Sequence, residues 1–249
     1  MKRQIIAIGG GSFASNPDNP LLERYIVAQT RKKKPRVCFL GTATGDADIY
    51  LTKFYAAFIK LGCVPTHVPL FARTPNLEKV LLSQDVIYVG GGNTKSMLAV
   101  WDDWGIPALL RKAWKQGTVL AGVSAGSICW FQHGVTDSWA DHLALLPCLG
   151  FLPGTCCPHF DSEVQRRPAV HHFVANGDVP SILAIDDGAA AHFVDGTLLR
   201  VVAAKLKAAG YMVRRVRGAA VETKLPVVFS RRPVSRWPLR PARESRTAV

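Results

Sequence analysis

The chain has 249 residues, of which 48% are hydrophobic and 20% charged, values typical of a globular protein with a sizeable core. No apolar run approaches the roughly 20 residues of a membrane-spanning helix. The apolar run near the N-terminus is also shorter than the roughly 7–15 residues of a secretory signal, so we expect a soluble, cytoplasmic protein without a membrane partner.

The net charge of +13 is concentrated in two segments. Residues 31–36 contribute +5, and residues 231–249, with six Arg and one Glu, contribute another +5. Neither segment interleaves aromatic with basic residues as RNA-binding proteins do, so nucleic acid is not an expected partner. We interpret the first segment as a solvated helix end. We expect one α/β domain over residues 1–230 and a basic, disordered tail over 231–249.

The first half of the chain alternates short apolar segments with segments of helical periodicity. The predicted strands are residues 4–8, 36–40, 64–70, 85–89 and 118–122. The predicted helices are residues 19–33, 49–61, 94–101, 107–116 and 125–132. This alternation is typical of βαβ units, and it predicts a parallel sheet whose functional groups lie at the carboxyl ends of the strands.

The character of the chain changes after Ser124. Residues 137–161 are rich in turn-forming residues, and residues 161–176 are predicted to form a helix. Three apolar runs follow, separated by Asp186-Asp187-Gly188 and Asp195-Gly196, which we interpret as hairpin turns. The sequence therefore predicts an α/β fold with a mainly parallel sheet flanked by helices and an antiparallel C-terminal extension.

The segment Gly122-Val123-Ser124-Ala125-Gly126 fits the nucleophile-elbow pattern G-x-S-x-G. A predicted strand precedes it and a predicted helix follows it, which is the context that this pattern requires. The glycines allow a tight turn that exposes the Ser124 hydroxyl. The Ala125 N–H group, at the start of the helix, would then stabilise an oxyanion.

A second oxyanion donor is expected from the glycine-rich segment 90–94. Gly91 or Gly92 is free of side-chain bulk and follows the strand before the elbow. This loop lacks the lysine of a Walker motif, and residues 9–12 lack the G-x-G-x-x-G spacing, so no nucleotide cofactor is predicted. The six cysteines contain no C-x-x-C pair, so we expect buried thiols and no metal.

A serine hydroxyl needs a base to accept its proton, and among the seven histidines His159 is the best placed. It lies in Pro158-His159-Phe160-Asp161, with a carboxylate two residues away. The carboxylates considered as its partner are Asp137, Asp141, Asp161 and Glu163. On the residues alone, Asp137 and Asp161 are equally well supported.

Four segments together resemble the dipeptidase E (peptidase E) family, relatives of cyanophycinase. They are Gly90–Thr94, Ala121–Ser127, Thr136-Asp137-Ser138 and Pro158–Asp161. The resemblance extends from about Gln4 to Phe229. It implies a fold similar to that of the class I glutamine amidotransferases, with serine in place of their cysteine. It also implies Ser124 as nucleophile, His159 as base and Asp137 as acid, with Asp161 as the alternative acid.

The best-known members of that family cleave dipeptides with an N-terminal aspartate, which implies a cationic recognition site. Arg166 and Arg167, which follow His159, are candidates to bind such a carboxylate, and Asn93 is a further substrate-binding candidate. The resemblance therefore predicts a serine peptidase acting on small peptides, as a monomer or a homodimer. N-terminal aspartyl dipeptides are one possible substrate class.

Two alternative functions are considered. An esterase of the α/β-hydrolase type shares the order of serine, acid and histidine, but its acid and histidine are usually far apart in sequence. Here all three predicted residues fall within 124–159, which disfavours that fold. The other alternative is a non-catalytic amidotransferase-like binding module whose basic tail engages a partner.

Overall fold

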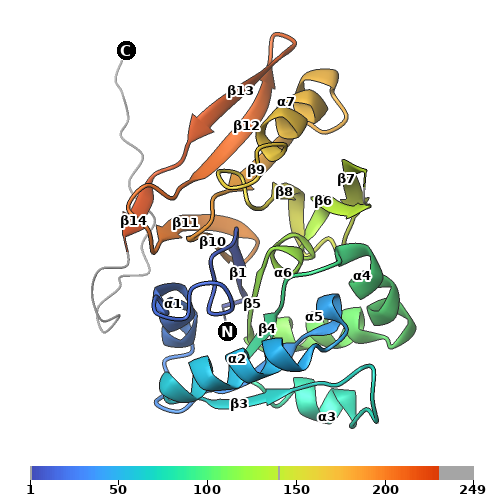
Figure 1. Cartoon of the computed structure of the whole chain (residues 1–249), viewed down its shortest axis with the longest axis vertical. Coiled ribbons are helices and arrows are strands. Elements are labelled where there is room, and N and C mark those ends of the chain that lie inside the picture. The colour runs from blue at the N-terminus through green and yellow to red at the C-terminus, as the bar shows by residue number, and fades with distance from the viewer. Residues whose placement is uncertain (1, 140, 230–249) are drawn as a thin grey trace.

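Two β-sheets form the framework of the protein, which is described here from a computed structural model covering residues 2–139 and 141–229 (Figure 1). The larger sheet has the strand order β14-β11-β10-β1-β5-β4-β2-β3. Its strands are β1 (Gln4–Ile8), β2 (Arg36–Leu40), β3 (Val64–His67), β4 (Val86–Val89), β5 (Val119–Val123), β10 (Ala189–Val194), β11 (Thr197–Ala203) and β14 (Val227–Phe229). Strands β1 to β5 run parallel, whereas β10 is antiparallel to both β1 and β11.

Helices cover both faces of this sheet because its central strands are apolar on both sides. Ile6 and Ile8 pack with side chains of α1 (Leu21–Gln29) and α2 (Asp48–Lys60). Ile5 and Ala7, which alternate with them, share a second core with four other helices. Those helices are α3 (Leu77–Leu81), α4 (Thr94–Asp103), α5 (Ile106–Lys115) and α6 (Ala125–Ile128).

A second sheet with the order β13-β12-β9-β8-β6-β7 lies at the end of the molecule away from α2 and β3 (Figure 1). Its strands are β6 (Phe131–Trp139), β7 (His142–Pro147), β8 (Leu152–Cys157), β9 (Ser181–Ile185), β12 (Gly210–Val216) and β13 (Ala219–Lys224). The helix α7 (Arg166–Asn176) packs on it through a separate apolar cluster that includes Val170 and Val174.

The predicted α/β class, with a mainly parallel sheet and antiparallel C-terminal strands, is confirmed. The second sheet was not predicted, because β7 and β8 fall in the segment that we interpreted as turns. The predicted helix over residues 125–132 is the short α6 (Ala125–Ile128), since Phe131 already belongs to β6. The predicted tail, residues 231–249, and its boundary at residue 230 lie outside the described residues.

The two predicted hairpin turns differ in outcome. Asp195-Gly196 does join the antiparallel pair β10 and β11. Asp186-Asp187-Gly188 instead carries the chain from β9 in the second sheet to β10 in the first. It is not a hairpin because β9 pairs with β8 and β12, while β10 pairs with β1 and β11.

Within residues 2–139 and 141–229, no helix combines the length and apolarity needed to cross a membrane. All six cysteines lie in this part of the chain and are free thiols. Four of them are buried, namely Cys38, Cys129, Cys156 and Cys157.

A buried carboxylate connects the loop after β1 to the first helix. Glu23 of α1 is fully buried, and its Oε1 atom accepts a hydrogen bond of 2.8 Å from the Phe13 N–H group. Its Oε2 atom has no hydrogen-bond partner. Burial outweighs the hydrogen bond from Phe13 and raises the pKa of Glu23 from 4.5 to about 7.

Glu23 should make the stability of the protein depend on pH. Because the pKa is higher in the folded state, the folded chain keeps a proton that the unfolded chain releases above about pH 4.5. This stabilisation is complete below that pH and is lost as the pH rises through about 7. The loss by pH 8 should be roughly 3 kcal/mol, and Glu23→Gln should remove this component.

The measurement is urea denaturation between pH 4.5 and 8 for the wild type, Glu23→Gln and the exposed control Glu78→Gln. The control should keep the pH slope of the wild type. Parallel pH profiles for the wild type and Glu23→Gln would contradict the assignment.

Candidate active site

Ser124 lies in a strained turn between β5 and α6. Its backbone angles, φ 56° and ψ −113°, fall in a region that L-residues rarely adopt, at a cost of about 1–3 kcal/mol. The surrounding structure holds this conformation: the Ser124 N–H donates to the Ile8 carbonyl at 3.1 Å, and the Ser124 carbonyl accepts from Ser127 and Ile128. The turn therefore has the geometry expected of a nucleophile elbow.

The two glycines of the elbow are required by close backbone contacts. A Cβ atom on Gly122 would lie 2.3 Å from the Gly126 carbonyl oxygen. A Cβ atom on Gly126 would lie 2.3 Å from the Val89 carbonyl oxygen. Both distances are far below van der Waals contact, so only glycine permits α6 to follow β5 at this angle.

A chain of hydrogen bonds connects Ser124 to a histidine and a carboxylate. The Nε2 atom of His159 lies 2.9 Å from Ser124 Oγ, and its Nδ1 atom lies 2.7 Å from Asp187 Oδ1. The His159 and Asp187 side chains are 20% and 23% exposed, so both are largely shielded from water but remain reachable. This hydroxyl–imidazole–carboxylate order is the arrangement that activates a serine for attack on a carbonyl carbon.

The carboxylate of this chain is Asp187, which the sequence analysis had placed in a hairpin turn. Burial disfavours its charge, but the hydrogen bond and charge of His159, the hydrogen bond of Ser162 and the charge of Lys205 outweigh burial. These contacts hold the pKa of Asp187 below its usual value, so the group is ionised at neutral pH. An ionised carboxylate stabilises the imidazolium that forms when His159 accepts a proton.

Asp137, the acid implied by the family resemblance, does not contact His159. Its carboxylate lies 3.5 Å from Arg166 Nη2 and is 65% exposed. The alternative, Asp161, accepts a hydrogen bond of 2.8 Å from the Asp187 N–H group and so holds the backbone of Asp187. Asp187, rather than Asp137, is thus the carboxylate that contacts His159, because the crossing between the two sheets brings it there.

The glycine loop after β1 makes room for the Asp187–His159 pair. A Cβ atom on Gly10 would lie 1.9 Å from Asp187 Oδ1 and 2.6 Å from His159 Nδ1. The Gly10 carbonyl also accepts a hydrogen bond of 2.8 Å from the Gly188 N–H group. The position of this loop at the carboxyl end of a predicted strand had indicated that it lies near the site, but none of its residues was predicted to contact the catalytic groups.

A pocket of about 310 Å³ opens around the Ser124 hydroxyl. It brings together many of the predicted site residues. The lining consists of Gly92, Asn93, Ser124, Asp137, Ser138, His159, Glu163 and Arg166. Gly91, Ala125, Asp161 and Arg167 are not among the residues that line it.

The two predicted glycine donors of the oxyanion site differ in their contacts. The Gly91 N–H donates to Tyr50 Oη at 3.2 Å, so it is already engaged. Gly92 lines the pocket with φ 133°, and a Cβ atom there would lie 2.2 Å from the Ala43 carbonyl oxygen. Ala125 directly follows Ser124 and begins α6, which has only four residues and therefore contributes little helix dipole at its N-terminus.

Asn93 has a structural role in the pocket wall. Its Oδ1 atom accepts from the Ser96 N–H at 2.9 Å and caps α4. Its Nδ2 atom donates to the Ser138 carbonyl at 3.2 Å, which joins α4 to β6.

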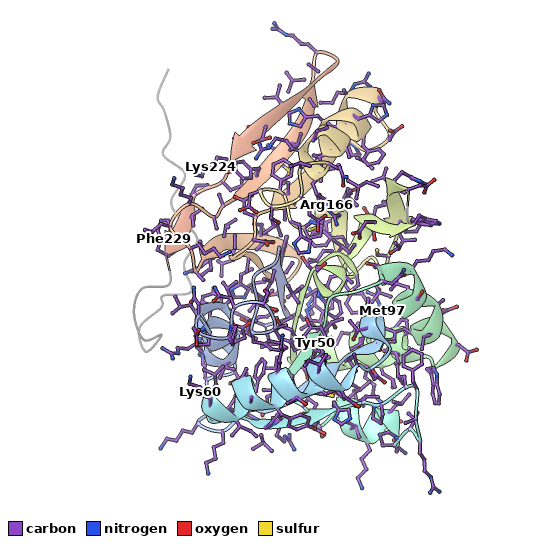
Figure 2. All side chains as sticks on the ribbon, in the orientation of Figure 1. Tyr50, Lys60, Met97, Arg166, Lys224 and Phe229 are labelled. Atoms are coloured by element: carbon purple, nitrogen blue, oxygen red, sulfur yellow. The ribbon has the colours of Figure 1, made fainter. Side chains whose placement is uncertain are left out.

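The two predicted arginines already have carboxylate partners. Arg166 is 2% exposed and lies in the interior of the molecule (Figure 2). Its guanidinium donates to Glu163 Oε2 at 2.6 Å and to the Val135 carbonyl at 2.9 Å. Arg167 pairs with Glu222 and lies over the Phe160 ring, outside the pocket.

The described part of the chain, residues 2–139 and 141–229, contains no group of three or more His, Cys, Asp and Glu side chains arranged to hold a metal ion.

Comparisons with known structures are consistent with the observed fold. A crystal structure of a Listeria monocytogenes EGD-e protein that carries the name peptidase E superimposes with a TM-score of 0.58, at 17% identity, covering 80% of this chain and 97% of that one. A crystal structure of a peptidase from an acI-B1 Actinobacterium gives a TM-score of 0.60, at 17% identity, covering 88% and 96%. At this identity the similarity concerns the fold alone.

Sequence comparisons confirm the predicted resemblance to the dipeptidase E family. The uncharacterized peptidase YgaJ of Bacillus subtilis (strain 168) is 48% identical over 228 residues, which cover 91% of this chain and 99% of that protein. The model of peptidase family S51 matches residues 5–201. These matches identify the chain as a peptidase and favour this function over the esterase and the non-catalytic binding module. The chain belongs to peptidase family S51.

Proposed function

We propose that this peptidase is a serine-type enzyme that hydrolyses small peptides through an acyl-Ser124 intermediate. The observation that carries the proposal is the hydrogen-bond chain from Ser124 Oγ to His159 Nε2, 2.9 Å, and from His159 Nδ1 to Asp187 Oδ1, 2.7 Å. The strained backbone of Ser124 supports the same role, since such strain is typical of nucleophile elbows.

In the first half of the reaction, His159 accepts the proton of Ser124 Oγ as the oxygen attacks the peptide carbonyl carbon. The negative charge that develops on the carbonyl oxygen is stabilised by the N–H groups of Gly92 and Ala125. The protonated His159 then donates its proton to the leaving amine, and the C–N bond breaks. The products of this half are the free amine and an ester of Ser124.

In the second half, His159 accepts a proton from a water molecule, which attacks the ester carbonyl. Collapse of the intermediate breaks the ester bond and returns the proton from His159 to Ser124 Oγ. Asp187 keeps His159 in the tautomer with a proton on Nδ1 and stabilises its charged form in both halves. The enzyme is regenerated and one water molecule is consumed.

The size and contacts of the pocket bear on the substrate. A volume of about 310 Å³ suits one or two residues of a peptide, which supports small peptides as substrates. An N-terminal aspartate would meet Arg166, but Glu163 and Asp137 already balance the charge of this guanidinium. A panel of dipeptides with Asp, Glu, Ala and Lys at the first position tests the preference directly.

Ser124→Ala should lower the turnover of cleaved dipeptides by about 10⁶-fold, because no other group forms the acyl intermediate. The variant should also lose labelling by a fluorophosphonate and should unfold at or above the wild-type temperature. Ser96→Ala, an exposed serine on α4, serves as the control and should keep wild-type turnover and labelling. Peptide turnover retained by Ser124→Ala would refute the mechanism.

Asp187→Asn should lower kcat by roughly 10³–10⁴-fold, because the amide no longer fixes the tautomer of His159 or stabilises its charge. Asp137→Asn, assayed on the same uncharged peptide, should lower kcat by less than about tenfold. Steady-state kinetics of the two variants decide between the two acids. The reverse order of effects would return the role of acid to Asp137.

Gly10→Ala should lower kcat by about 10²-fold, because the new methyl group displaces the carboxylate of Asp187. Gly62→Ala is the matched control: Gly62 has φ 76°, but a Cβ atom there meets no other atom within 4 Å. The control should lose about 1 kcal/mol of stability and keep its kcat. Equal kcat losses in the two variants, measured alongside urea denaturation, would show that the Gly10 effect is not local to the site.

A further inference from the structure

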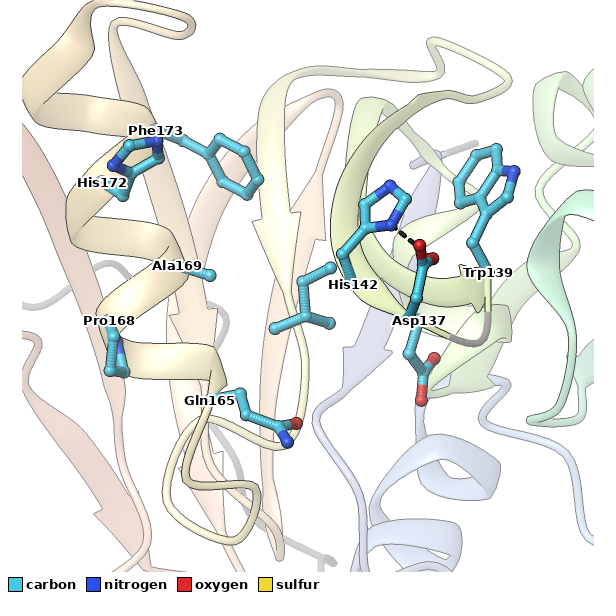
Figure 3. Close-up of a pocket in the computed structure, with 10 residues that line it drawn as sticks. Asp137, Trp139, His142, Gln165, Pro168, Ala169, His172 and Phe173 are labelled. Atoms are coloured by element: carbon cyan, nitrogen blue, oxygen red, sulfur yellow. Dashed lines mark hydrogen bonds and ion pairs between the residues drawn. The ribbon is translucent and has the colours of Figure 1, made fainter.

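A second, larger pocket lies beside the pocket that holds Ser124. Its volume is about 680 Å³, and it lies between α7 and the hairpin of β6 and β7 (Figure 3). Asp137 lines both pockets. The two pockets therefore lie next to each other at Asp137.

The walls of this pocket are largely apolar. Leu143 and Trp139 contribute from the hairpin, and Pro168, Ala169 and Phe173 contribute from α7. Figure 3 shows the Phe173 ring projecting from α7 toward the hairpin. Such walls suit the hydrocarbon part of a long side chain.

Two carboxylates, those of Asp137 and Asp141, line this pocket. The Asp137 and Asp141 carboxylates are 65% and 83% exposed, so both are open to a ligand from solvent. Among the described residues that line this pocket, none is Lys or Arg. The guanidinium of Arg166 approaches Asp137 at 3.5 Å but is itself 2% exposed and bound to Glu163.

The other titratable side chains that line the pocket are two histidines. Lys95 is not in the lining, but its Nζ atom lies 5.7 Å from the centre of the Trp139 ring. His142 holds Asp141 through its Nδ1 atom at 2.5 Å. His172 of α7 lies 3.0 Å from Asn176 Nδ2 through its Nε2 atom. The lining of this pocket therefore holds two carboxylates and no Lys or Arg, in a chain whose net charge is +13.

We propose that this pocket binds the side chain of a lysine or arginine residue that flanks the scissile bond. Its aliphatic stem lies against Leu143 and Phe173, and its cation pairs with Asp137 and Asp141. An aromatic side chain would fill the apolar walls but add no positive charge beside the two exposed carboxylates, and an acidic one would be repelled. The proposal deepens the peptidase function proposed above and rests on it for the placement of the scissile bond.

The test compares lysine with norleucine, which has the same aliphatic stem without the charge, and with glutamate. Each residue is placed on either side of the scissile bond of an otherwise uncharged peptide. For the wild type, kcat/KM should be about fivefold higher for lysine than for norleucine in one of the two positions, as expected for an exposed ion pair. The preference should fall as the salt concentration rises from 0.05 to 0.5 M.

Variants of Asp137 and Leu143 test separately how the charge and the aliphatic stem of the lysine side chain contribute to kcat/KM. Asp137→Asn should bring the lysine-to-norleucine ratio close to one, whereas Asp18→Asn, an exposed carboxylate on the loop before α1, should leave the ratio unchanged. Leu143→Ala should lower kcat/KM for lysine and norleucine peptides by the same factor. Circular dichroism confirms that each variant is folded.

The same peptides are titrated by calorimetry into Ser124→Ala, so that binding is measured without turnover. Tighter binding of the lysine peptide, lost in the double variant with Asp137→Asn, supports the pocket even if the serine mechanism fails. Equal affinity for lysine and norleucine, or a preference for glutamate, overturns the proposal even if Ser124 is the nucleophile.

Discussion

The hydrogen bond between Asp187 and His159 depends on the absence of a side chain on the backbone segment that follows β1. Gly10 lies so near the pair that a single methyl group would overlap the carboxylate. Gly122 and Gly126 allow an equally close approach at the elbow, where Ser124 is held in a strained conformation. The site is therefore assembled by backbone packing at the ends of β1 and β5, and its side chains are positioned by that packing.

Each of the two sheets contributes residues to this site. The larger sheet supplies Ser124 at the end of β5, and its helix-covered core makes the elbow rigid. The second sheet supplies His159, which follows β8, and the chain then crosses back to the larger sheet through Asp187. The mechanism thus requires both sheets to hold their relative position, which the Asp187–Asp161 and Gly188–Gly10 hydrogen bonds help to maintain.

The same arrangement accounts for the charge around the substrate site. Arg166, the residue first considered for binding an acidic substrate, is buried under Glu163 and Asp137, and Arg167 lies with Glu222 outside the pocket. A buried arginine with two carboxylate neighbours stabilises the pocket wall, and its charge is already balanced before an anionic substrate binds. The exposed charges that remain beside Ser124 are acidic, although the protein as a whole is strongly basic.

The sequence by itself determined the parallel strands, most of their helices and the elbow around Ser124, because these depend on local periodicity and on glycine at neighbouring positions. It also indicated His159, whose segment is distinctive. Only the tertiary structure brought Asp187 to His159 and formed the second sheet. Asp187 is 28 residues from His159, and its Asp-Asp-Gly segment has the composition of an ordinary hairpin turn. Whether such a turn closes a hairpin or joins two sheets depends on which strands pair, and that pairing is set by packing between distant segments rather than by local sequence.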